Sequence, residues 1–115
     1  MKVIIVCGGL DYSDAEYAFA FLDKVAPECL LVIQGAAKGA DQIGRDWAKD
    51  SGIHCATVPA RWDRFGKRAG PYRNTAMLRL RHDAVIAFPG GSGTAHMVAA
   101  AKRAGIPVIE APGRE

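Results

Sequence analysis

One glycine-rich run carries the residue types that most often meet a phosphate group. It holds three glycines and two hydroxyl side chains: Pro89, Gly90, Gly91, Ser92, Gly93 and Thr94. Glycines let a ligand approach the main chain closely, and hydroxyl groups can donate to an anion or cap a helix. The alanine-rich residues 95–104 favour a helix, whose first amides carry roughly half a positive charge. This pattern predicts a phosphate or nucleotide site. The alternative is a strand–helix turn in which the glycines only pack.

Two earlier turns combine glycines with side chains that could hold a sugar or a phosphate. Their candidate ligand contacts are Gly8, Gly9, Asp11, Tyr12, Gly35, Lys38, Gly39 and Asp41. Acidic residues bind ribose hydroxyls in dinucleotide folds, which makes Asp11 and Asp41 candidates, although Asp41 is equally placed to cap its helix. Lys38 suits a phosphate or simply faces solvent. Tyr12 suits stacking on a base or packing in the core.

The stretch 59–70 is basic and aromatic, and we expect it to be the longest irregular segment of the chain. Long loops in compact domains often carry function. Trp62 is a candidate to stack on a base, with packing as the alternative. Pro71 suits the first turn of a helix that carries Arg73 and Asn74. The Arg73 guanidinium has the planar fork that clamps a phosphate, and the alternative is a surface ion pair. Asn74 could bind a base or a ribose.

The same stretch holds four cations, which are Arg61, Arg64, Lys67 and Arg68. A solvated basic face is the more common role of such a run, and binding of single-stranded nucleic acid is the alternative. The formal net charge of +3 permits an anionic ligand without requiring nucleic acid. We therefore do not expect nucleic acid to be the main partner.

The three cysteines, Cys7, Cys29 and Cys55, are odd in number and lack the C-x-x-C spacing of a zinc site. Each lies in or beside an apolar run, which predicts buried thiols, with a nucleophilic Cys7 as the less favoured alternative. We expect no metal and no cofactor. His96 falls in the first turn of the last expected helix, where an exposed or packing role is favoured over a catalytic one.

Length and composition predict one domain, residues 1–115, with an ordinary globular balance of 50% hydrophobic and 23% charged residues. No apolar run is long enough to span a membrane, and Met1 leads straight into an apolar strand rather than a signal peptide. We therefore expect a cytoplasmic protein without a membrane partner.

Five short apolar runs predict the strands that must position these side chains: Lys2–Cys7, Cys29–Ile33, Ile53–Val58, Val85–Phe88 and Pro107–Glu110. They alternate with helical patterns and are apolar throughout, as in strands that are covered by helices on both faces. A capping box over residues 13–16, with Ser13 as the cap, marks the start of the first helix.

This alternation predicts an α/β protein with a Rossmann-like three-layer fold, a five-stranded parallel sheet in the order 3-2-1-4-5 and helices on both faces. Ligands bind such sheets at the carboxyl ends of the strands, where the strand order reverses. In this order the reversal lies between the first and fourth strands. These two strands are the ones followed by the turns Gly8-Gly9 and Gly90-Gly91.

Five motifs occur in order along the chain. They are Gly8-Gly9-x-Asp11-Tyr12, Gly35-Ala36-x-Lys38-Gly39-Ala40-Asp41 with Trp47-Ala48, Pro59-Ala60-x-Trp62, Gly70-Pro71-x-Arg73-Asn74-x-x-Met77 and Phe88-Pro89-Gly90-Gly91-x-Gly93-Thr94. Together they resemble the YspA/CpYpsA-related family of the SLOG superfamily over nearly the whole chain. The resemblance implies a Rossmann-like fold that binds nucleotides or nucleotide-derived ligands, ADP-ribose-like compounds among them. Its relatives include the LOG phosphoribohydrolases and the DNA-processing protein A family. The resemblance also allows a homodimer.

Two positions depart from the family pattern. Leu10 stands where the family commonly has Arg, so an anion contact is absent there. The LOG enzymes pair an Arg, which Arg73 matches, with a Glu just after Pro-Gly-Gly-x-Gly-Thr, where this chain has Ala95-His96-Met97. Cleavage of an N-glycosidic bond needs such a carboxylate, so hydrolysis of the LOG type is not expected.

Three functions stay open at this point. The favoured one is the binding or sensing of a small nucleotide or nucleotide derivative, such as an ADP-ribose-like compound or a nucleoside phosphate. An alternative is a hydrolase that cleaves an N-glycosidic or phosphate bond of such a ligand, with Arg73, Asp11 and Asp41 as candidate catalytic residues. A second alternative is a single-stranded nucleic-acid binder.

Overall fold

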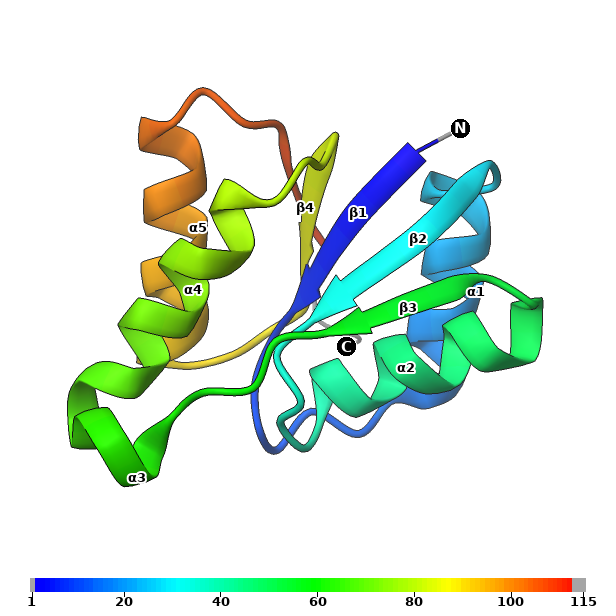
Figure 1. The fold of residues 1–115 in the computed structure, drawn as a ribbon. Helices are drawn as coiled ribbons and strands as arrows, with labels where there is room; N and C mark the ends of the chain where they lie inside the picture. Colours follow the sequence, from blue (N-terminus) through cyan, green and yellow to red (C-terminus); the bar gives the residue numbers. More distant parts are fainter. Residues whose placement is uncertain (1, 113–115) are drawn as a thin grey trace.

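The chain folds around a five-stranded parallel sheet, in a computed structural model that describes residues 2–112 (Figure 1). The strands are β1 (Lys2–Cys7), β2 (Cys29–Gln34), β3 (His54–Thr57), β4 (Ala84–Ala87) and β5 (Val108–Glu110). Their order is β3-β2-β1-β4-β5, and every neighbouring pair is parallel. The predicted strand order is therefore confirmed.

Helices cover both faces of this sheet. The helices of the described chain are α1 (Ala15–Val25), α2 (Ala40–Ser51), α3 (Trp62–Phe65), α4 (Ala69–Arg79) and α5 (Ser92–Arg103), with a 3-10 turn, η1 (Gly66–Arg68), between α3 and α4. Figure 1 shows α1 and α2 on one face, and α4 and α5 on the other. The predicted Rossmann-like three-layer fold is confirmed. None of the helices described within residues 2–112 is long and apolar enough to cross a membrane.

The central strand β1 shows why the sheet needs two helical layers. Successive side chains of a strand point to opposite faces of the sheet. Ile4 and Val6 belong to the hydrophobic core shared with α1 and α2, whereas Val3, Ile5 and Cys7 belong to the core shared with α4 and α5. All five side chains are buried, so each helical layer removes one row of apolar groups from water.

The prediction of strands buried on both faces is wrong at the edge of the sheet. β3 is mostly exposed, and its Cys55 is an exposed thiol rather than a buried one. Cys29 is half-buried, and Cys7 is buried. The difference follows from position, because β3 pairs with β2 alone whereas β1 has a strand on each side.

The first helix is capped by a different residue from the one that we predicted. Asp14 is the N-cap in place of Ser13, and its carboxylate accepts a hydrogen bond from the Tyr17 amide at 3.2 Å. A carboxylate at this position also interacts favourably with the positive end of the helix dipole. A serine hydroxyl lacks this second interaction.

The basic stretch is not the irregular loop that we predicted. Residues 62–79 form α3, η1 and α4 in succession, with Pro71 in the first turn of α4 as expected. Helices of three or four residues are too short to show an apolar period, and they depend on tertiary contacts for their stability. This is why the sequence pattern did not reveal α3 and η1.

The carboxyl ends of β1 and β4 are neighbours, so the turns that follow them meet. The Phe88 amide donates to the Cys7 carbonyl at 2.9 Å, and the Gly9 amide donates to the Pro89 carbonyl at 2.9 Å. The turn after β2 joins them, because the Ala40 amide donates to the Gly9 carbonyl at 3.1 Å. Three glycine-containing turns therefore gather at one end of the sheet.

Candidate functional site

A cleft of about 1420 Å³ opens where these three turns meet α4 and α5. The predicted contacts that line it are Gly8, Gly9, Asp11, Tyr12, Gly35, Lys38, Asp41, Trp62, Arg73, Asn74, Pro89, Gly90, Gly91, Ser92, Gly93 and Thr94. Gly39 lies outside the lining. It is the N-cap of α2, and a Cβ at this position would collide with the Gly9 and Leu10 carbonyl groups.

One group of glycines around the cleft is required for packing. A Cβ added at Gly9 would lie 2.9 Å from the Pro89 carbonyl oxygen, and one added at Gly90 would lie 2.6 Å from the Gly9 amide nitrogen. The absence of side chains here lets the turns after β1 and β4 touch. The Gly9 amide donates to Pro89, so it is already used within the protein.

A second group of glycines faces open space. Gly91 and Gly93 line the cleft, and within residues 2–112 no atom beyond the chain neighbours and the backbone of α5 lies within 4 Å of a Cβ added at either position. Gly91 is the N-cap of α5 without a side-chain cap, and the first helical bond runs from the Ala95 amide to the Gly91 carbonyl at 3.0 Å. The preceding amides of the first turn have no partner within the helix. The capping role considered for Ser92 and Thr94 is therefore wrong, and α5 presents an uncapped N-terminus at the cleft.

Arg73 bridges α4 and the turn after β2. This half-buried side chain donates from Nη1 to the Gly35 carbonyl at 2.7 Å and from Nε to the Asn74 Oδ1 at 3.0 Å. Gly35 leaves room for it, because a Cβ there would lie 2.8 Å from the Arg73 Cζ. The alternative of a surface ion pair is therefore wrong. Neither bonded partner carries a charge, so these hydrogen bonds do not neutralise the guanidinium.

Asp41 holds the turn after β2 in place. Its side chain is 6% exposed, and its Oδ2 accepts hydrogen bonds from the amides of Gly35 at 3.1 Å and Ala37 at 3.3 Å. Burial raises the pKa of this carboxyl above its ordinary value, and the Ala37 amide and the Arg73 charge oppose the rise. Asp41 is not the N-cap of its helix, so the capping alternative is wrong. Its bonds to the turn were not expected from the spacing.

Sequence reasoning missed Gln34 and Arg45, which support the same turn. Gln34 is fully buried, and its Nε2 donates to the Thr57 Oγ1 at 2.7 Å. Its Oε1 accepts two hydrogen bonds, from the Ala36 amide at 2.7 Å and from the Arg45 Nη1 at 2.8 Å. Arg45 also donates from Nη2 to the Ala37 carbonyl at 3.1 Å. This network holds Ala36 at a φ of 65°, a left-handed conformation that is costly outside glycine. The signal in the sequence was a glutamine at the end of an otherwise apolar strand.

The aromatic and charged residues at the cleft differ in exposure. The Tyr12 ring stacks on Phe88, with centroids 5.2 Å apart, so it packs on the core while it lines the cleft. Trp62 on α3 is 59% exposed and leaves its ring accessible for stacking. Asp11 and Lys38 are exposed on their turns.

Asn74 links α4 to α5 inside the cleft. This side chain is 4% exposed; its Nδ2 donates to the Gly93 carbonyl at 3.3 Å and lies 3.1 Å from the His96 Nδ1. His96 is half-buried and lines the cleft, a position that we did not predict for it. Its position in the cleft depends on the packing of α5 against α4, which the sequence pattern does not reveal.

Cys7 lines the cleft but lacks the properties of a nucleophile. Burial, with a smaller effect of the Asp41 charge, raises the pKa of the Cys7 thiol to about 12, so the thiolate is scarce at neutral pH. Within residues 2–112, no three His, Cys, Asp or Glu side chains are grouped so that they could hold a metal ion. The cleft is lined by Arg73, Asn74, His96 and a few other polar side chains, together with its glycine-containing turns.

Comparison with known proteins places the chain in a family. A family model described as "YspA, cpYpsA-related SLOG family" matches residues 2–65, which is more than half of the chain. The chain is also similar to the Gene 61 protein of Mycobacterium phage D29, with 35% identity over 119 residues that cover 95% of each protein. The first three motifs of the cleft lie inside the matched residues, and the alignment with the phage protein extends over the glycine-rich turn as well. The chain belongs to the YspA, cpYpsA-related SLOG family.

Proposed function

We propose that this protein binds a small nucleotide or nucleotide derivative, such as an ADP-ribose-like compound or a nucleoside phosphate, in the cleft. The observation that carries the proposal is the uncapped N-terminus of α5, which opens onto the cleft at Gly91 and Gly93. Membership of the SLOG family supports a nucleotide-related ligand.

The start of α5 and Arg73 together define a phosphate subsite, residues 91–94 with Arg73. First-turn amides and the helix dipole favour a bound anion, and an arginine fork supplies charge-assisted hydrogen bonds. Both features line the same cleft. Because the Gly9 amide already donates to Pro89, the turn after β1 shapes the cleft more than it binds the phosphate.

The dimensions of the cleft suit more than a phosphate. Its volume of about 1420 Å³ exceeds the roughly 300–1,000 Å³ of ordinary small-molecule pockets. A base and one or two riboses therefore have room beside the phosphate. The exposed ring of Trp62 offers a surface on which a base can stack.

Calorimetry with AMP, ADP-ribose and NAD tests this proposal. We expect Gly91→Val to weaken binding at least tenfold, because the new side chain fills the space in front of the first-turn amides. The position has room for the change, since no group beyond its chain neighbours lies within 4 Å of a Cβ at Gly91.

Ala99→Val is the matched control, because it adds bulk at an exposed position of the same helix. We expect it to bind like the unaltered protein. The proposal is overturned if the unaltered protein binds none of the three nucleotides, or if Gly91→Val binds them equally well.

A hydrolase is the second candidate, because Asp11 and Arg73 line the cleft that holds the phosphate subsite. Asp41 is less available as a catalytic group, since its Oδ2 accepts two backbone hydrogen bonds. Chromatography of AMP and ADP-ribose after incubation distinguishes the two functions. If the unaltered protein forms cleavage products and Arg73→Ala does not, the result favours hydrolysis. If the unaltered protein leaves the ligands intact, the result favours binding.

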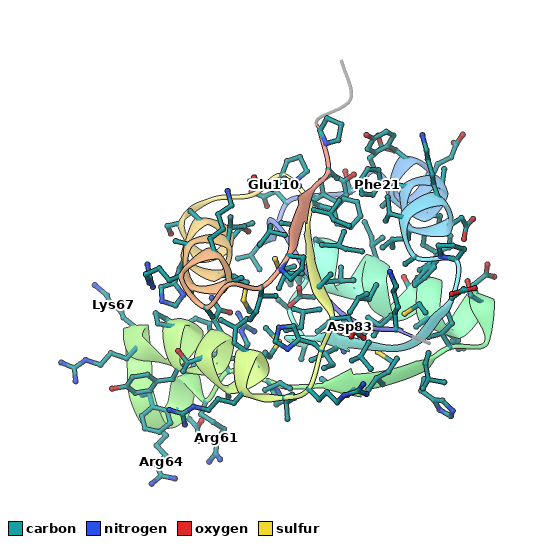
Figure 2. The ribbon with its side chains drawn as sticks, turned by 90° about the horizontal axis from the view of Figure 1, so that it is seen from above. Phe21, Arg61, Arg64, Lys67, Asp83 and Glu110 are labelled. Atoms are coloured by element: carbon teal, nitrogen blue, oxygen red, sulfur yellow. The ribbon has the colours of Figure 1, made fainter. Side chains whose placement is uncertain are left out.

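Single-stranded nucleic acid is a weaker alternative. Arg61, Arg64 and Lys67 extend outward from the end of the molecule that carries α3 and η1 (Figure 2). The Arg61 Nε lies 3.7 Å from the Asp63 Oδ1, and the Arg64 guanidinium carbon lies 5.3 Å from the ring centroid of Phe65. Such local contacts between neighbouring residues are those expected of a solvated face. Steeply salt-dependent binding of an oligonucleotide would favour this alternative.

Location and assembly belong to the same proposal. The three cysteines are free thiols, which fits the cytoplasmic location that we propose. A homodimer is proposed from the family resemblance, and light scattering of the purified protein measures it directly.

A further inference from the structure

We propose that Asn74 fixes His96 as a hydrogen-bond donor to the ligand, next to the phosphate subsite. The inference rests on the proposed function and adds a specificity-determining residue to the same cleft. It follows from one hydrogen bond within α4, between Arg73 and Asn74, and from two that connect Asn74 with the first turns of α5.

The orientation of the Asn74 amide is set by Arg73. An arginine side chain only donates hydrogen bonds, so the atom of Asn74 that lies 3.0 Å from the Arg73 Nε must be the carbonyl Oδ1. The Nδ2 group then faces α5, where it donates to the Gly93 carbonyl at 3.3 Å. A flipped amide would lose both interactions, and the side chain is buried, so the orientation is unambiguous.

The fixed amide in turn selects one tautomer of His96. The Asn74 Nδ2 is a donor and lies 3.1 Å from the His96 Nδ1, which must therefore accept. A neutral imidazole that accepts at Nδ1 carries its proton on Nε2. Within residues 2–112 no protein group is bonded to this Nε2.

The geometry of the helix directs this donor towards the phosphate subsite. Side chains of an α-helix lean towards its N-terminus, so His96 lies over the turn that contains Gly93. His96 lines the cleft, and the edge of its ring that is not bonded to Asn74 is the edge left for a ligand. An oxygen acceptor beside the bound phosphate, either a second phosphate oxygen or a ribose hydroxyl, matches a neutral N–H donor at this place.

Nitrogen NMR of the histidine rings tests the tautomer without any ligand. The chain has three histidines, so His54→Gln and His82→Gln leave the His96 signals identified. At pH 8.5 we expect the Nε2–H form of His96. Asn74→Asp should shift His96 to the Nδ1–H form, because a carboxylate can only accept a hydrogen bond from that nitrogen. An Nδ1–H form in the unaltered protein overturns the inference.

Calorimetry with AMP, ADP-ribose and NAD tests the role of the donor. We expect His96→Leu to weaken binding by about tenfold or more, as the loss of a hydrogen bond to an anion implies. His96→Gln should keep most of the affinity, because its amide is also a donor of similar reach. His54→Leu, at an exposed position on β3, is the matched control and should bind normally.

The two proposals fail in different ways. If the unaltered protein binds none of AMP, ADP-ribose and NAD, the proposed function fails, and the ligand role of His96 fails with it. If the unaltered protein binds and His96→Leu binds equally well, the function stands and the inference about His96 is overturned.

Discussion

Several side chains in and behind the wall of the cleft act on the protein's own backbone. Asp41, Gln34 and Arg73 each bond to the turn after β2, through the amides or carbonyls of residues 35–37. Ala36 in this turn adopts a left-handed conformation, which persists because the surrounding bonds restrain it. One wall of the cleft is therefore ordered before a ligand arrives, and binding does not have to supply that ordering free energy.

The raised pKa of Asp41 makes stability depend on pH. Burial is the main cause of the rise above the ordinary value of about 4. Between that value and the higher folded value, the folded protein retains a proton that the unfolded chain has lost. The free energy of unfolding therefore falls as pH rises through this window.

Asp41→Asn tests this linkage, because the amide oxygen can still accept from the turn while no charge is buried. We expect the free energy of unfolding of this variant, relative to the unaltered protein, to increase as pH rises through the window. Urea unfolding at a series of pH values measures it, with Asp50→Asn correcting for the loss of one negative charge on α2. A difference that stays constant with pH would contradict the prediction.

Among the elements, α5 is the one on which the proposed function depends. It begins after a glycine N-cap and has a second glycine, Gly93, in its first turn. Glycine weakens a helix relative to alanine because it loses more backbone entropy on folding. The open space at Gly93 fits the proposed function, since a side chain there would occupy the proposed phosphate subsite.

Gly93→Ala should therefore separate stability from binding. We expect the variant to be more stable by about 0.5 kcal/mol and to bind AMP or ADP-ribose at least tenfold more weakly. Ala99→Gly, at an exposed position of the same helix, should do the reverse, with lower stability and unchanged affinity. Thermal unfolding and calorimetry measure the two quantities. Equal affinity of Gly93→Ala and the unaltered protein would exclude close contact between a ligand and this turn.

For the whole molecule, the layered sheet decides which thiol is accessible. Cys7 lies on the central strand and is buried, Cys29 is half-buried, and Cys55 lies exposed on the edge strand. Burial also raises the pKa of the Cys7 and Cys29 thiols, which lowers their thiolate fraction. Low accessibility and a small thiolate fraction therefore both lower the reactivity of the buried thiols.

We expect a thiol reagent at neutral pH to modify Cys55 first and Cys7 last. Modification of Cys7 should require a local or global unfolding of the sheet, so the rate of this modification should rise steeply with added urea. Mass spectrometry of digested samples follows each site, and Cys55→Ser should remove the fast phase. Rapid labelling of Cys7 in the native protein would show that the cleft exposes this thiol.

Local patterns in the sequence determined the architecture of this protein. Apolar runs of strand length, separated by helical periods, specify a parallel sheet, and the handedness of the crossovers leaves few strand orders. The glycines at residues 8–9 and 90–91 follow the two strands at the reversal, so the position of the cleft was also predictable. These features depend on residues that are close together in the chain, or on rules that hold for all such sheets.

Only the tertiary structure decided what each residue of the cleft does. Gly90 packs against Gly9 whereas the neighbouring Gly91 faces open space, although the two are adjacent and identical in type. Asn74 meets His96 across 22 positions of the chain, and Gln34 meets Thr57 across 23. Such roles depend on distances between packed elements, and a distance across a folded core leaves no periodic trace in the sequence.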